Sequence, residues 1–167
     1  MPAIEVDGVA RQFGWLPDLP DNNDYSIQTP KVAEFRKKAK ILQPQKSGLI
    51  KLPNTCSLRE LCSDVHDQSS LGSCCGQAGV ATAESAQIKE FGKYVPLSPL
   101  FLYKVTRRLM GLAGDTGASL RDTMKALVLF GAPPEDAWKY IIQNFDVAPD
   151  WYACGFAKEF QSLKYYR

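Results

Sequence analysis

The sequence has 167 residues, of which 45% are hydrophobic and 23% are charged. This length corresponds to one domain, or to one domain with an extension, and the composition excludes wholesale disorder and a collagen-like chain. Twenty Lys and Arg oppose eighteen Asp and Glu, so the net charge of +2 lacks the basic excess of a nucleic-acid binder. No apolar run reaches the roughly 18 residues that cross a bilayer, and the first residues lack a secretory signal pattern. We therefore expect a cytoplasmic protein that binds neither nucleic acid nor membrane.

The first 51 residues carry turn and linker signals. Two prolines and clustered Asp and Asn forbid a regular helix in residues 14–25, so we expect an extended segment that lies along the rest of the protein. Apolar residues at three- and four-residue spacing after Pro30 predict a short amphipathic helix to about Leu42. A linker containing Pro, Ser and Gly follows, and residues 49–53 are expected to be extended.

Most of the remaining chain is predicted to be helical. A short helical turn near residue 60 precedes a long helix of small residues that includes Cys74 in its first turn, runs to about Glu90 and is closed by Gly92. Such a helix is suited to close burial. Helix-start signatures at Ser98-Pro99 and at Ser119 predict two further helices, the second of which ends before residue 131. The aromatic-rich tail gives no clear pattern. The sequence contains no internal repeat and no low-complexity segment.

Five cysteines occur in the chain: Cys56, Cys62, Cys74, Cys75 and Cys154. Because the number is odd, at least one thiol stays outside any disulfide within the chain. In a reducing cytosol, free thiols serve as buried hydrophobic groups, metal ligands or nucleophiles. The question is therefore which cysteine has a reactive thiol.

The segment from Gln68 to Cys74 has the strongest chemical pattern. Cys74 is predicted to lie in the first turn of the long helix, where the positive end of the helix dipole lowers the pKa of a thiol. Free backbone N–H groups at that helix start can hold an oxyanion, and the amide of Gln68 can add a donor. Gly72 lets the chain turn sharply just before the helix. A thiolate with preorganised donors is suited to acyl transfer, although a buried cysteine at a helix start also serves packing alone.

These residues resemble the papain-like cysteine peptidases, whose nucleophile lies in a Gln-x-x-x-Gly-Ser-Cys context. The resemblance is of the bacterial type and covers residues 57–140, with further matching runs at 97–103, 117–122 and 131–140. It implies that Cys74 is the nucleophile and that Gln68 and the Cys74 backbone N–H form the oxyanion hole. It also implies contacts with the substrate backbone from Gly72, Ser73, Gly117 and Ala118.

The fold implied by the resemblance is mainly α in this chain. It is the helical lobe of a papain-like α+β fold, with an extended N-terminal prosegment and without the β-rich second lobe. Residues 1–51 would form a propeptide-like segment that fills the cleft, and residues 52–167 a truncated helical lobe. The implied activity is hydrolysis of peptide or protein substrates through a thioester at Cys74, with no cofactor and no metal ion.

Several features depart from the family pattern. Cys75 and Gly76 follow the nucleophile position, where the family usually carries an aromatic residue or Thr, and Leu71 replaces a frequent half-cystine. The family's histidine lies roughly 130–150 residues after the nucleophile. Only 93 residues (167 − 74) follow Cys74, and the sole histidine, His66, precedes it. We therefore expect the catalytic His and Asn to be missing from this chain, which is then inactive alone, and we expect His66 to be a surface or capping residue.

Two other interpretations stay open. The chain could be an inactive binding or regulatory module of papain-like fold, with its cleft filled by the N-terminal segment. Alternatively, Cys74 and Cys75 could form a metal or redox site with Cys56 and Cys62, although adjacent cysteines fit a tetrahedral ion poorly. An uncovered face between the lobes could also support a homodimer.

Overall fold

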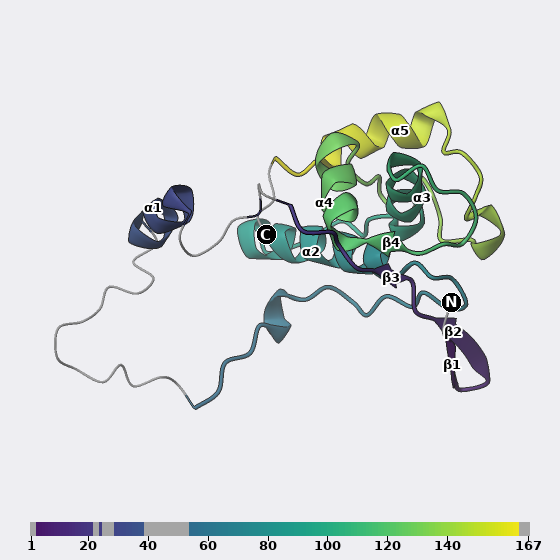
Figure 1. Ribbon diagram of the computed structural model, residues 1–167, viewed down its shortest axis with the longest axis horizontal. Coiled ribbons are helices and arrows are strands. Elements are labelled where there is room, and N and C mark those ends of the chain that lie inside the picture. Colours follow the sequence, from purple (N-terminus) through teal and green to yellow (C-terminus); the bar gives the residue numbers. More distant parts are fainter. Residues whose placement is uncertain (1–2, 22–23, 25–28, 39–53, 164–167) are drawn as a thin grey trace. The chain divides into compact units, whose positions relative to one another are not determined.

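The computed structural model describes residues 3–21, 24, 29–38 and 54–163. The chain divides into two compact units, Met1–Asp18 with Arg59–Tyr165 and Leu19–Leu58 with Tyr166–Arg167. The predicted amphipathic helix is present in the second unit as α1 (Pro30–Lys38), and its expected continuation to Leu42 lies outside the described residues. The expected extended stretch at 49–53 also lies outside them. Every predicted site residue belongs to the first unit (Figure 1).

The first residues form a β-hairpin that the sequence analysis missed. Strands β1 (Ala3–Val6) and β2 (Val9–Gln12) pair antiparallel. Asp7 and Gly8 join them and both have positive φ, 53° and 74°, as a type I′ turn requires. The next strand, β3 (Trp15–Leu16), lies in the segment that was predicted to be extended.

Three helices form the centre of the first unit: α2 (Cys74–Phe91), α3 (Pro99–Leu109) and α4 (Leu120–Leu129). Their ends follow the predicted signals. Gly92 closes α2 with a left-handed φ of 70°. The hydroxyls of Ser98 and Ser119 accept backbone N–H groups from the first turns of α3 and α4. Each of these caps satisfies a donor that the helix itself leaves free.

Glycines allow α2 to approach its neighbours closely. A Cβ atom at Gly76 would lie 2.8 Å from the carbonyl oxygen of Pro99, at the start of α3. A Cβ atom at Gly79 would lie 2.7 Å from a methyl group of Leu102 and 2.8 Å from one of Thr123. The small residues predicted for close burial therefore form the face of α2 that packs against α3 and α4.

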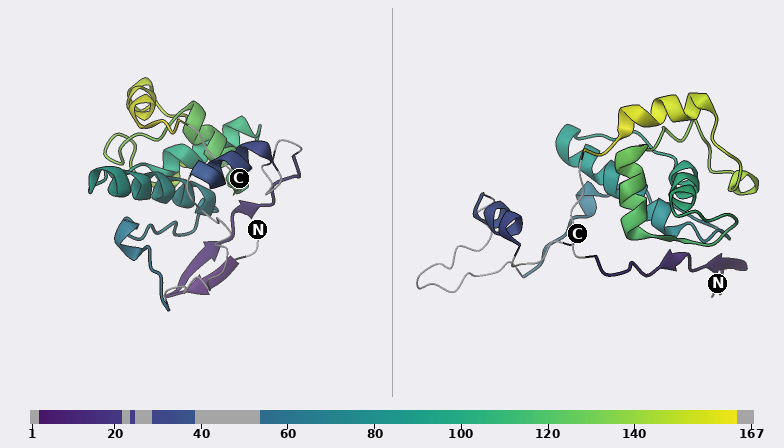
Figure 2. Two further views of the ribbon diagram at one scale, coloured as in Figure 1. Left: turned by 90° about the vertical axis from the view of Figure 1, so that its left-hand side faces the viewer. Right: turned by 45° about the horizontal axis from the view of Figure 1, so that its top comes forward.

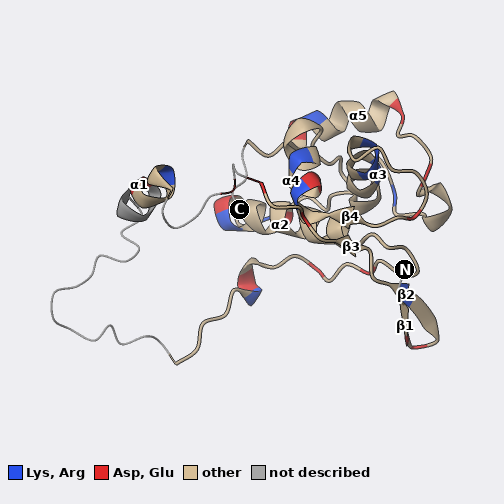
Figure 3. Cartoon of the chain, viewed as in Figure 1, with Lys and Arg blue, Asp and Glu red and all other residues tan. Residues whose placement is uncertain are grey.

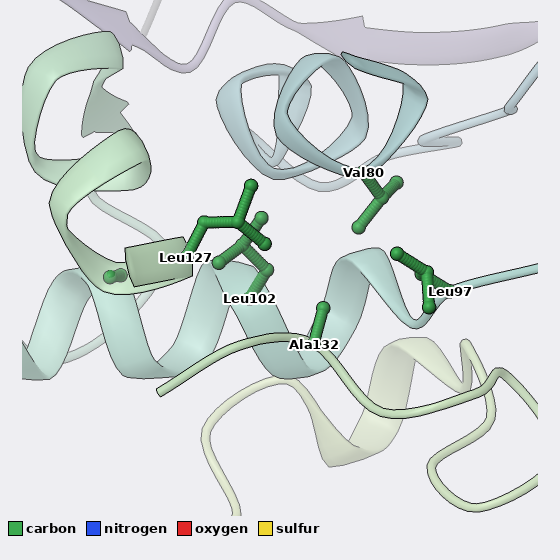
Figure 4. Close-up of a cluster of buried hydrophobic side chains, with 6 residues drawn as sticks. Val80, Leu97, Leu102, Leu127 and Ala132 are labelled. Carbon is green, nitrogen blue, oxygen red and sulfur yellow. The ribbon is translucent and has the colours of Figure 1, made fainter. Parts of the chain in front are cut away.

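The main hydrophobic core lies among these three helices and the segments that flank them (Figure 4). Its buried members are Val80, Leu97, Leu102, Ala126, Leu127 and Ala132. Burial of such aliphatic side chains stabilises the fold by about 1.5–3 kcal/mol for each large side chain. This core fixes the position of α2, whose first residue is Cys74.

The tail that gave no clear pattern contains a short helix. The 3-10 turn η2 (Ile142–Asn144) precedes α5 (Trp151–Ala157), and η3 (Lys158–Phe160) follows it. Asp150 caps α5, and Ala153 and Ala157 of α5 pack with Phe101 of α3. Figure 2 shows the ribbon from two further sides. At the other end of the unit, η1 (Arg59–Leu61) matches the predicted helical turn.

A second, two-residue strand completes the site region. β4 (Ala118–Ser119) is buried and pairs with β3 in parallel, with Trp15 opposite Ala118 and Leu16 opposite Ser119.

Positive and negative residues occur together on α4 and near the end of α2, as Figure 3 shows. Within the described ranges, no helix has the length and apolar character that would cross a membrane.

Candidate active site

Cys74 is the first residue of α2 and is half-buried. The preceding Ser73 does not cap the helix with its side chain, because its hydroxyl lies 2.6 Å from the hydroxyl of Tyr140. No side-chain cap therefore competes for the first backbone N–H groups of α2. The N–H groups of Cys74 and Cys75 act instead on the Cys74 sulfur and lower its pKa. The helix start thus provides the anion-stabilising environment that the sequence predicted.

The pKa of Cys74 is lowered from 9.0 to about 6. The largest cause is the hydrogen bond from the Cys75 thiol, and backbone N–H groups, including that of Gly14, add to it against the opposing effect of burial. The pKa of Cys75 is raised by the same hydrogen bond and by burial, so Cys75 keeps its proton. Its Sγ also lies 3.0 Å from the carbonyl oxygen of Ala118, which is a second possible acceptor for the same thiol proton. The negative charge of the pair therefore resides on Cys74.

Gln68 lies in the loop before α2. Its side-chain Nε2 donates to the backbone carbonyl of Gln12 at 2.7 Å. The backbone carbonyl of Gln68 accepts the hydroxyl of Tyr140 at 2.9 Å and the N–H of Leu71 at 3.3 Å. The hydroxyl of Tyr140 thereby links the loop at Gln68 to Ser73, and it fixes the loop relative to the start of α2.

Gly14 contacts most of the predicted site residues. Its carbonyl oxygen accepts the N–H of Ala118 at 2.8 Å, and its own N–H acts to lower the pKa of Cys74. A Cβ atom at Gly14 would lie 1.6 Å from the carbonyl oxygen of Gly72. On the other side, a Cβ atom at Gly117 would lie 2.3 Å from the carbonyl oxygen of Gly14. The structure therefore brings Gln68, Gly72, Cys74, Gly117 and Ala118 together around one short piece of the N-terminal segment.

The N-terminal segment crosses this region starting at Gln12, two residues earlier than the expected segment 14–25. After the parallel pairing of β3 with β4, the carboxylate of Asp18 accepts the N–H of Arg121 at the start of α4, at 3.0 Å. Residues 22–23 and 25–28 lie outside the described residues. Within the described part, residues 12–18 cover the thiol, the amide of Gln68 and the β4 strand.

The expectation that His66 is a surface or capping residue is wrong. Its Nε2 lies 2.8 Å from a carboxylate oxygen of Glu84, whose side chain is fully buried on α2. The other oxygen of Glu84 accepts the N–H of Leu97 at 2.8 Å. The hydrogen bond to Glu84 raises the pKa of His66 against the effect of burial. Burial acts to raise the pKa of Glu84, but the bonds from His66, Ser63 and Leu97 lower it overall. His66 is therefore hydrogen-bonded to a buried carboxylate, with which it forms an ion pair when it is protonated.

Two residues that the sequence analysis gave no role also hold the site. The carboxylate of Asp115 accepts the N–H of Gly72, and the hydroxyl of Tyr103 contacts both Asp115 and the N–H of Gly117. Asp115 lies 43 positions beyond Gly72 in the sequence. A contact over that separation leaves no local signal, so only the folded structure reveals it.

None of the five cysteines forms a disulfide, and Cys56, Cys62 and Cys154 are exposed. In the part of the chain that the structure describes, no three His, Cys, Asp or Glu side chains are grouped as ligands for a metal ion. The metal-site interpretation therefore gains no support.

Comparisons with known proteins bear on the whole chain. No family model matches it. It is 30% identical over 169 residues to an uncharacterized peptidase C1-like protein of Acanthamoeba polyphaga mimivirus, a match that covers 98% of this chain and 54% of that protein. Among solved structures it is similar to xylellain, a cysteine protease from Xylella fastidiosa, with a TM-score of 0.71, 25% identity, and coverage of 93% of this chain and 57% of that chain. A structure from work on the mite allergens Blo t 1 and Der p 1 is similar in fold, with a TM-score of 0.50, 19% identity, and coverage of 81% of this chain and 46% of that chain.

The fold is thus the mainly helical portion of a papain-like fold. The resemblance to the papain-like cysteine peptidases is confirmed, since a bacterial cysteine protease and a viral peptidase C1-like protein are among the proteins that the chain matches. The chain spans about half the length of those two proteins, 54% and 57%.

Proposed function

We propose that this chain is part of the precursor of a papain-like cysteine endopeptidase that hydrolyses peptide bonds through a thioester at Cys74. Gln68 and the Cys74 backbone N–H are the oxyanion hole in this proposal. The substrate backbone is bound by Gly72, Ser73, Gly117 and Ala118. Support comes from the lowered pKa of Cys74, from the uncapped start of α2 and from the similarity to cysteine peptidases.

In the proposed reaction, the Cys74 thiolate attacks the carbonyl carbon of a peptide bond. The carbonyl oxygen takes up the negative charge and accepts hydrogen bonds from the Gln68 amide and the Cys74 N–H. The tetrahedral intermediate then expels the amine and leaves a thioester on Cys74, which water hydrolyses. Cys75 stays protonated and takes no part as a nucleophile, because burial and the neighbouring sulfur raise its pKa.

Proton transfer to the amine and from the water needs a further group. The only histidine of the chain, His66, is bound to Glu84. We assign the general base and its orienting Asn to residues outside this chain. Loss of one member of a catalytic triad commonly lowers turnover by about 10⁴-fold, so the 167 residues alone are expected to show no measurable peptidase activity.

Residues 1–51 act as a propeptide in this proposal. The observation that carries it is the hydrogen bond from the Gln68 amide to the carbonyl oxygen of Gln12, at 2.7 Å. The donor that would hold an oxyanion is already occupied, and the N–H of Ala118 is occupied by Gly14. A peptide substrate would have to displace the segment from both donors.

Substitution of Gly14 tests this arrangement. In a Gly14→Ala variant the new methyl group meets backbone atoms of Gly72, at 1.6–2.6 Å, and backbone cannot turn aside as a flexible side chain does. The segment must therefore leave, and the rate at which iodoacetamide alkylates Cys74 should rise by about tenfold or more, since each 1.4 kcal/mol of lost binding is a factor of ten. Mass spectrometry with fragment ions locates the alkylated thiol, and the exposed Cys154 serves as the internal reference.

Gly155→Ala is the matched control, because a Cβ atom at Gly155 meets nothing within 4 Å. This variant should alkylate Cys74 at the wild-type rate. A Gly14→Ala variant that also alkylates at the wild-type rate would show that the segment does not cover the thiol. Labelling that persists unchanged in Cys74→Ala would show that another thiol had been observed.

A second candidate function is an inactive binding module whose cleft the N-terminal segment fills. It is favoured by the engagement of the only histidine with Glu84. Alkylation of Cys74 at pH 7 in the Gly14→Ala variant separates the two proposals. A thiolate poised for attack alkylates faster than Cys154, whereas in a module without an activated thiol Cys74 alkylates no faster than Cys154.

A further inference from the structure

A continuous series of hydrogen bonds joins the two sides of the region that Gly14 crosses. The N–H of Gly72 points at both carboxylate oxygens of Asp115, at 3.0 and 3.1 Å. The hydroxyl of Tyr103 donates to Asp115 at 2.6 Å and accepts the N–H of Gly117 at 3.0 Å. A phenol donates one proton and can accept with its lone pairs, so the hydroxyl of Tyr103 can serve both partners at once. One carboxylate–phenol pair therefore holds both Gly72 and Gly117.

The carboxylate–phenol pair is anchored in the interior. Tyr103 lies on α3 and is fully buried, in a cluster with Cys75 and Ala118. The guanidinium of Arg107, also buried, lies 4.2 Å from the ring centre of Tyr103 and donates to the carbonyl of Gly114. Burial, together with the bond to Asp115, raises the pKa of Tyr103, so the phenol remains a donor at neutral pH. These contacts leave the pair little freedom to shift.

The gap between Gly72 and Gly117 is tight where Gly14 crosses it. Cβ atoms placed at Gly14 or at Gly117 would come within 1.6 or 2.3 Å of opposing backbone oxygens, far inside the roughly 3.0 Å below which Cβ contacts do not occur. The opposing groups are backbone atoms, so rotation of a side chain gives no relief. Any widening must move Gly72 or Gly117, and both are tied to Asp115 and Tyr103.

We propose that Asp115 and Tyr103 are positioning residues that set the distance between Gly72 and Gly117, and that this distance admits only glycine where the N-terminal segment crosses. The inference rests on the proposed function, because it takes residues 12–18 to be the segment that covers Cys74. It adds a specificity rule for that segment. Any peptide that runs through this gap in the direction of the N-terminal segment must have a glycine between Gly72 and Gly117.

A double-mutant cycle tests the rule. Tyr103→Phe removes the hydroxyl but keeps the ring beside Arg107, so the two sides lose their link while the core packing stays. In the wild-type background, Gly14→Ala should raise the Cys74 alkylation rate about tenfold or more. In the Tyr103→Phe background the same substitution should raise it less than about threefold, since contacting residues couple by about 0.5–3 kcal/mol. A purely structural role for Tyr103 would not change the effect of a methyl group at position 14.

Tyr94→Phe is the control background, because the Tyr94 hydroxyl bonds to Asp64 and to none of the residues around Gly14. There the effect of Gly14→Ala should equal that in the wild type. An equal effect in the Tyr103→Phe background would overturn the rule while the proposed function stands. No effect of Gly14→Ala in the wild type would overturn the proposed function, and the rule with it. Should Tyr103→Phe not fold, Asp115→Asn replaces it in the cycle and is judged by the same outcomes.

Discussion

Replacement of His66 by Gln removes the cation that faces a fully buried carboxylate. Glu84 has no exposed side-chain surface, and its partner His66 is 22% exposed. Glu135 and Asp64 also face His66 and favour its charged form. After the substitution, Glu84 keeps the N–H of Leu97 but loses its only cationic hydrogen-bond partner among the described residues. The carboxylate must then stay charged without a counter-charge or take up a proton.

The expected loss of stability follows from this geometry. Removal of one partner from a fully buried ion pair costs about 3–5 kcal/mol. His66 is partly exposed and the Leu97 bond remains, so we expect a smaller loss than that, about 2–3 kcal/mol. An exposed pair gives the contrast. Lys125→Gln breaks a surface contact of 3.6 Å with Asp122 and should cost less than about 1 kcal/mol.

The loss should depend on pH in a defined direction. The pKa of His66 is raised above 6.5, so its contribution is complete below pH 6.5 and disappears as the pH rises through the raised value. The pKa of Glu84 is lowered below 4.5, so its contribution is complete above pH 4.5 and disappears as the pH falls through the lowered value. The pair therefore stabilises the fold most between pH 4.5 and 6.5.

Urea denaturation of wild type and His66→Gln at pH 5.5 and at pH 8.5 checks this expectation. The difference in the free energy of unfolding should be larger at pH 5.5. Equal differences at the two pH values, or a difference below about 0.5 kcal/mol at pH 5.5, would refute the ion-pair argument.

Two further outcomes are expected. The alkylation rate of wild-type Cys74 should rise with pH and show an inflection near pH 6. In Gly14→Ala the inflection should move to higher pH, because one N–H donor is withdrawn from the sulfur. A wild-type rate that still climbs steeply through pH 8.5 would contradict the lowered pKa of Cys74. Gly79→Ala should destabilise the fold by about 1–3 kcal/mol, because its methyl group overpacks against Leu102. Gly155→Ala should be neutral or slightly stabilising, and equal urea midpoints for the two variants would show that α2 has room at Gly79.

The helices around the core could be predicted because their boundary signals are local. Ser98, Ser119 and Gly92 act on N–H and carbonyl groups within four residues of themselves. The helix α5 has such a cap in Asp150 but no readable face. Its buried residues are the small Ala153 and Ala157, while large aromatic side chains of α5 are exposed, so the sequence shows no apolar face.

The hairpin at residues 3–12 was missed for a related reason. All four residues of β1 are exposed, so the strand shows no alternation of buried and exposed positions. The Asp7-Gly8 pair was the available signal, since both residues have the positive φ of a type I′ turn. A turn sequence such as Asp7-Gly8, without an alternating pattern in the residues on either side, was not enough to predict that β1 and β2 pair.

In the candidate site, too, the residues that are close in the sequence could be predicted and the contacts between distant residues could not. Gln68, Gly72 and Cys74 lie within seven residues, and their chemistry could be interpreted from the sequence. Contacts over 43 and 56 positions, from Gly72 to Asp115 and from Gln68 to the carbonyl of Gln12, carry no such signal. Residue types alone do not specify which distant group satisfies a given donor.

On the proposed function, the N-terminal segment blocks the site without silencing the thiol. The N–H of Gly14 helps to lower the pKa of Cys74, so the covered state contains more thiolate than the segment's removal would leave. The segment must therefore inhibit by occupying the hydrogen-bond donors that a substrate would need, namely the amide of Gln68 and the N–H of Ala118. The start of α2 still favours the thiolate once the segment has left, since the N–H groups of Cys74 and Cys75 belong to the helix. Uncovering the site thus exposes a thiol that is already prepared for attack.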